Sequence, residues 1–80
     1  MDGWLEEARG KLAEAVDEDP SAYDLTRVQM DELLELARIA AHSSGERTNA
    51  PLICYLVGLA HGRHGGDLGD LVDATVGTST

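Results

Sequence analysis

The chain is poor in basic residues and in cysteine, and each shortage excludes a class of protein. Six lysines and arginines stand against fifteen aspartates and glutamates, which gives a formal net charge of −9. Phosphate repels such a chain, so we expect no nucleic-acid partner and no attachment to an anionic membrane surface. A single cysteine, Cys54, excludes an internal disulfide framework and suits a reducing compartment, so we predict a cytoplasmic protein.

Long hydrophobic runs are also missing. The apolar run at residues 50–60 has eleven residues, whereas a membrane helix needs about 20. No basic segment followed by an apolar run stands near residue 1, so no secretory signal is expected. Eighty residues allow one domain with a modest core and no room for a cofactor-sized cavity. We therefore predict a single domain over residues 1–80 that holds no cofactor and spans no membrane.

Four segments show the spacing of amphipathic helices. Apolar residues at intervals of three and four predict helices over about residues 2–16, 27–42, 50–63 and 67–76. Thr26 and Gln29 form a capping-box pattern, Asp67 is expected to cap the fourth helix, and Gly65 ends the third. The buried face of the second helix is predicted to hold Met30, Leu33, Leu34, Ala37, Ala40 and Ala41. No segment alternates like a strand, so the predicted fold class is all-α, a compact four-helix domain.

The predicted third helix is apolar around nearly its whole circumference. Such a helix is expected to lie centrally, with the other helices packed about residues 50–62 and with Leu56 in the core. Gly58 and Gly62 have the spacing that lets a neighbouring helix approach closely. Three short helices are nevertheless few to cover this one, and small domains often complete their cover by oligomerising.

Three stretches of the chain carry a family resemblance. They are Trp4–Leu5, the sequence LLELAR at 33–38 followed by Ala41 and His42, and the segment APLICYLVGLAHGRHGG at 50–66. Together they resemble a small actinobacterial domain family of uncharacterised function, which occurs alone or fused to molybdenum-cofactor guanylyltransferases. The resemblance spans roughly residues 4–76, and it departs from the family where Thr48, not proline, follows Arg47. It implies an association with molybdopterin guanine dinucleotide synthesis and supplies no catalytic residues.

The end of the third helix carries the candidate site residues His61, Arg63 and His64. Their simplest role is to place positive charge at the negative end of the helix. Cys54 and the two histidines could also be imagined as metal ligands, although their spacing matches no recognised metal pattern. The glycines before Asp67 could cradle an anion, but the Asp67 carboxylate is placed to occupy the same N–H groups.

No activated nucleophile, metal set or nucleotide loop can be assembled from these residues, so we predict no enzyme activity. One function is a non-catalytic interaction or accessory module for molybdenum cofactor biosynthesis or molybdoenzyme maturation, in keeping with the resemblance. An exposed apolar patch around Trp4 or Tyr55 would favour it. The alternative is a protein that binds a small ligand, an anion or a metal. That reading requires His61, Arg63, His64 and Cys54 to converge on one cleft.

Residues 47–66 contain no acidic side chain. We therefore expect contact with a partner near Tyr55, His61, Arg63 and His64. The expected partner is a protein, either a molybdenum-cofactor guanylyltransferase, a molybdoenzyme or a second copy of the chain.

Overall fold

A computed structural model describes residues 2–77, and this range contains four α-helices, one short 3₁₀ helix and no strand. In chain order the elements are α1 (Gly3–Ala15), η1 (Pro20–Tyr23), α2 (Arg27–Ser44), α3 (Asn49–His64) and α4 (Leu68–Val76). The all-α class is confirmed, and the four predicted helices agree with the observed limits to within two residues. No helix among the described residues is long and apolar enough to cross a membrane.

Hydrogen bonds at the helix starts explain why these limits could be predicted. The Thr26 hydroxyl accepts from the Gln29 amide at 3.0 Å, and the Gln29 side chain accepts from the Thr26 amide at 2.9 Å. These bonds form the predicted capping box of α2. The Asp67 carboxylate accepts from the Asp70 amide at 3.2 Å and caps α4, as expected.

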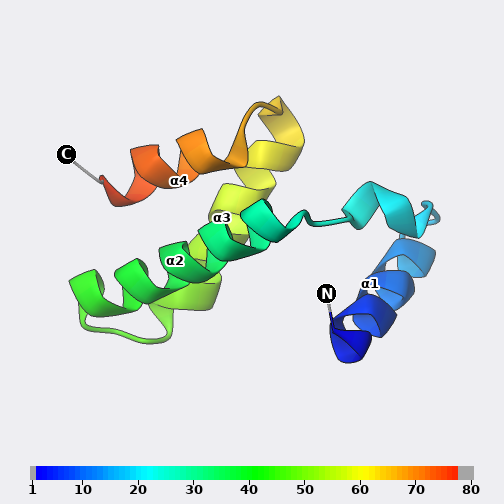
Figure 1. The fold of residues 1–80 in the computed structure, drawn as a ribbon, viewed down its shortest axis with the longest axis horizontal. Coiled ribbons are helices and arrows are strands. Elements are labelled where there is room, and N and C mark those ends of the chain that lie inside the picture. Colours follow the sequence, from blue (N-terminus) through cyan, green and yellow to red (C-terminus); the bar gives the residue numbers. More distant parts are fainter. Residues whose placement is uncertain (1, 78–80) are drawn as a thin grey trace.

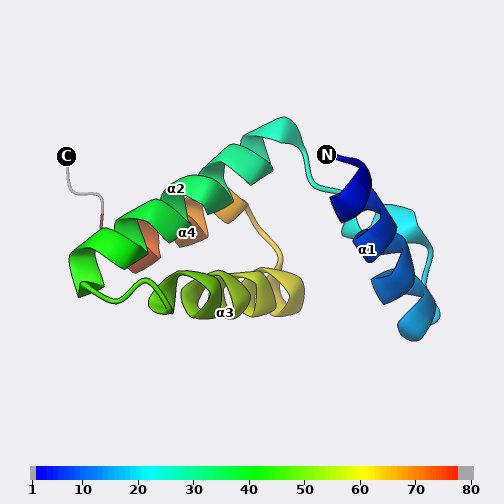
Figure 2. The ribbon, with the colours of Figure 1, turned by 90° about the horizontal axis from the view of Figure 1, so that it is seen from below.

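The core is built by α2, α3 and α4. Leu36 of α2 is fully buried, and Val57 of α3 and Leu68 and Val72 of α4 are buried against it. Half-buried apolar residues from the same helices surround this cluster, namely Leu33, Ile53, Cys54, Leu71 and Val76. Figures 1 and 2 show α2 and α4 side by side, with α3 packed across them. Because the cluster is small, each of its members has a large share in stability.

The first helix lies apart from this core. Within residues 2–77, η1 is the only other helix that α1 contacts, and both views show α1 to one side of the remaining helices (Figures 1 and 2). The Arg9 guanidinium pairs with the Asp24 carboxylate, and the Tyr23 hydroxyl donates to Glu18. The radius of gyration is 13.4 Å, against about 11.6 Å for a globular chain of this length.

The predicted central position of the third helix is therefore corrected in one respect. α3 contacts α2 and α4 but not α1 within the described range, and Leu56 is 55% exposed instead of lying in the core. Two helices cannot surround a third, so one side of its apolar circumference stays in solvent. Gly58 and Gly62 face open space in residues 2–77, and no helix of the same chain approaches them closely.

Candidate functional site

α3 presents a row of large apolar side chains to solvent. Leu52, Tyr55, Leu56 and Leu59 are 43–68% exposed. Intervals of three and four residues place them on one side of the helix, while Val57 is directed into the core. We call these four residues the α3 face. The three leucines and the tyrosine ring provide a broad apolar contact area, and the tyrosine hydroxyl can still bind water.

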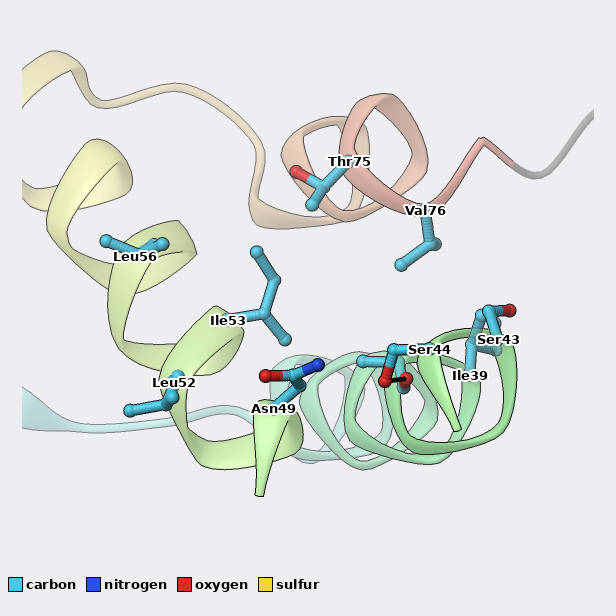
Figure 3. Close-up of a pocket in the computed structure, with 10 residues that line it drawn as sticks. Ile39, Ser43, Ser44, Asn49, Leu52, Ile53, Leu56, Thr75 and Val76 are labelled. Carbon is cyan, nitrogen blue, oxygen red and sulfur yellow. Dashed lines mark hydrogen bonds between the residues drawn. The ribbon is translucent and has the colours of Figure 1, made fainter. Parts of the chain in front are cut away.

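An apolar groove borders the α3 face. It has a volume of about 630 Å³ and lies between the last turns of α2, the first turns of α3 and the end of α4. Figure 3 shows Leu52, Ile53 and Leu56 on the α3 side, with Val76 of α4 and Ile39 of α2 across from them. The groove and the α3 face share Leu52 and Leu56, and so form one continuous surface.

The structure divides the predicted site residues. Tyr55 belongs to the α3 face, and Arg63 continues its row four residues after Leu59. His61 is half-buried and turned toward the following loop, where its Nε2 donates to the carbonyl oxygen of Gly66 at 3.0 Å. His64 is exposed at the last residue of α3. The two grooves described here are lined by none of the three residues His61, Arg63 and His64.

Cys54 lies in the contact between α2 and α3. Its thiol donates to the carbonyl oxygen of Leu33 at 3.8 Å, a long contact of the kind that sulfur makes. Among residues 2–77, no group of three or more histidine, cysteine, aspartate or glutamate side chains is placed to hold a metal ion. The cysteine therefore belongs with the core residues of α3 and not with the histidines at its end.

We expect the Cys54 thiol to react slowly with alkylating reagents at neutral pH. Burial raises the pKa of this thiol, so the folded protein holds the proton more tightly than the unfolded chain does. The resulting stabilisation is complete below the pKa of the unfolded thiol and is lost as the pH rises through the higher pKa of the folded one. Iodoacetamide rates against pH, for native and urea-unfolded protein, measure both values. A native pKa at or below the unfolded one would contradict this prediction.

A second groove, between α2 and α4, is acidic. It has a volume of about 400 Å³, and carboxylates dominate its lining: Asp31, Glu32, Glu35, Asp67, Asp70 and Asp73. These carboxylates could not be placed together from the sequence, because they come from two parts of the chain separated by more than twenty residues. The groove concentrates negative charge on α2 and α4, whereas α3 carries no acidic residue.

Sequence reasoning also missed three of the four residues of the α3 face. Leu52, Leu56 and Leu59 share the helical spacing of Tyr55, which was a signal for a common face. Their composition nevertheless suggested a buried helix, because leucines of this kind usually lie in cores. The small number of helices available to cover the third one correctly indicated that part of its apolar surface is exposed.

Comparison with known proteins places this chain among domains without an assigned role. No curated protein and no solved structure matches it significantly. A family model described as a domain of unknown function (DUF6457) matches residues 1–79. Since the match covers nearly the whole chain, the protein belongs to the DUF6457 family, a family of small domains of unknown function.

Proposed function

We propose that this protein is a non-catalytic protein-interaction module whose binding surface is the α3 face. The observation that carries the proposal is the exposure of Leu52, Tyr55, Leu56 and Leu59 in one row. The chain has a net charge of −9. An exposed apolar row beside a groove is therefore unexpected on its surface. Contiguous exposed apolar surface with a polar rim is typical of protein-binding sites.

The shape of this surface suits a helical segment. Amphipathic helices bind by laying residues at intervals of three and four into an apolar groove. The groove beside Leu52 and Leu56 offers such a depression, and Tyr55 stands next to it as an aromatic anchor of the type that dominates binding energy. Arg63, at the end of the row, would fix the orientation of an acidic partner.

The family resemblance suggests the partner. The resemblance implies fusion to molybdenum-cofactor guanylyltransferases in some members, and such a fusion would hold two domains at high local concentration, so that even a weak interface between them would form. We propose that this domain makes the same interface with a guanylyltransferase, or with a molybdoenzyme that receives its product. The chain would then be an accessory protein of molybdopterin guanine dinucleotide synthesis.

The alternative of a ligand or metal site at His61, Arg63 and His64 has less support. The His61 ring is bonded to the Gly66 carbonyl, and the Asp67 carboxylate is bonded to the Asp70 amide at the start of α4. An anion would have to displace these contacts, and Cys54 lies away from them against Leu33.

Isothermal titration of the protein with the molybdenum-cofactor guanylyltransferase of the same organism tests the proposal. We expect Tyr55→Glu to weaken binding about tenfold or more, because it removes the aromatic ring and places a charge within the apolar row. Leu34→Glu is the matched control, since Leu34 is 69% exposed but lies on α2, and it should bind like the wild type. Absence of binding by the wild type to both the guanylyltransferase and a molybdoenzyme would refute the proposal, as would equal binding by the two variants.

A further inference from the structure

α1 carries an unpartnered apolar row of its own. Trp4, Leu5, Leu12 and Val16 are 37–78% exposed, and within residues 2–77 η1 is the only other helix that α1 contacts. With 13 residues, α1 is about 20 Å long at 1.5 Å per residue. The stretch from Leu52 to Arg63 on α3 covers about 17 Å by the same rise. The chain thus exposes two apolar rows of matching length.

The basic residues show a complementary charge pattern. Four of the six form ion pairs: Arg9 with Asp24, Lys11 with Glu7, Arg27 with Asp31 and Arg38 with Glu35. The other two, Arg47 and Arg63, form none with any described residue, and they stand just before α3 and at its end. α1, by contrast, has Glu6 and Glu7 near its start and is followed by the acidic residues 17–19.

The surface area of the chain is large for its mass. Its accessible surface is 5934 Å² at 8.5 kDa, whereas a monomeric globular protein of this mass exposes about 4,700 Å². The excess is about 1,200 Å², and each partner in a standard protein interface buries about 800 Å². One further interface of this size would therefore remove about two thirds of the excess.

We propose that a second copy of this chain covers the α3 face with its α1, and that the two copies do so reciprocally in a two-fold dimer. The inference rests on the proposed function, because it uses the same binding face and names an occupant for it. An antiparallel arrangement opposes the two helix dipoles and places the first turn of α1, which carries Glu6, at the same end of the interface as Arg63. The acidic residues 17–19 then lie near Arg47.

Two glycines allow the docked helix to come close. Gly58 and Gly62 lie along the Tyr55 edge of the α3 face, and within residues 2–77 nothing stands within 4 Å of a Cβ built at either position. A helix backbone can therefore approach α3 more closely there than it could over larger side chains. This gives the Gly-x-x-x-Gly spacing a role between copies that it lacks within one chain.

Trp4 is the only tryptophan of the chain, so its fluorescence reports directly on the docking of α1. Sedimentation equilibrium and tryptophan emission should be recorded over the same range of protein concentration. We expect a monomer–dimer transition accompanied by a shift of the emission to shorter wavelength, because docking removes the exposed indole from water. Leu59→Glu and Arg63→Glu should each raise the dissociation constant about tenfold or more, and Leu34→Glu should leave it unchanged.

A charge exchange separates specific docking from general apolar association. Glu6→Arg combined with Arg63→Glu should restore part of the dimerisation that Arg63→Glu alone removes, because Glu6 lies in the first turn of α1 at the Arg63 end of the interface. A strict monomer, or an emission shift independent of concentration, would overturn the inference while leaving partner binding through Tyr55 untouched. A dimer that persists in Leu59→Glu would also overturn it. A dimer that depends on Leu59 and Arg63, in a protein that binds neither proposed partner enzyme, would refute the function and uphold the inference.

Discussion

Replacing Leu36 with alanine should lower the free energy of unfolding by about 2–5 kcal/mol. Leu36 is fully buried at the centre of the cluster formed with Val57, Leu68 and Val72, and alanine would leave a cavity there. A domain of this length has a total stability of about 4–12 kcal/mol, so the variant would lose a large fraction of it. Urea unfolding followed by circular dichroism measures the loss.

Leu34→Ala is the matched control for this experiment. Leu34 lies two residues earlier in the same helix but is 69% exposed, so its truncation should change stability by no more than about 0.5 kcal/mol. Leu56→Ala should have a small effect for the same reason, although the sequence alone placed Leu56 in the core. Equal losses for Leu36→Ala and Leu34→Ala would show that the core is not where the structure has it.

Gly65→Ala should destabilise the protein by about 1–3 kcal/mol. Gly65 ends α3 with φ 71° and ψ −156°, a backbone conformation that is essentially restricted to glycine. A Cβ at this position would strain the link between α3 and α4 even though the space around it is open in the described chain. Thermal unfolding detects the loss as a lower Tm.

Gly58→Ala should have the opposite effect. Gly58 lies inside α3 with ordinary helical geometry and open space beyond it in residues 2–77, so alanine should stabilise the helix by up to about 1 kcal/mol. The measurement belongs at protein concentrations low enough to keep the chain monomeric. If Gly65→Ala and Gly58→Ala both raised Tm or both lowered it, backbone strain at position 65 would not explain the effect of Gly65→Ala.

The helix limits could be predicted because they depend on local signals. Thr26 and Gln29 cap α2 through bonds over three residues, and Asp67 caps α4 in the same way. Leu68 and Val72, which stand four residues apart in the predicted fourth helix, are both buried. Each of these features depends on neighbours within one or two turns, and a sequence shows such neighbours directly.

The arrangement of the helices could not be predicted in the same way. Periodicity shows that a helix has an apolar side, but not which element covers that side or whether any does. The predicted buried face of α2 therefore included the exposed Leu34 and omitted Leu36. η1 was missed as well: the sequence predicts only that the first helix ends near residue 16, and the bond from the Ser21 amide to the Asp19 carboxylate forms only once the chain turns there.

Because α1 and η1 make no packed contact with the other helices in the described range, they can open without exposing the core. In a single chain, amide hydrogens of α1 would then exchange with solvent through local opening, while those around Leu36 would wait for global unfolding. Residues 24–26 would separate two folding units of unequal stability. In the reciprocal dimer, docking of α1 on α3 would join these units across the two-fold axis, so that the cooperativity missing from one chain would come from its association with another.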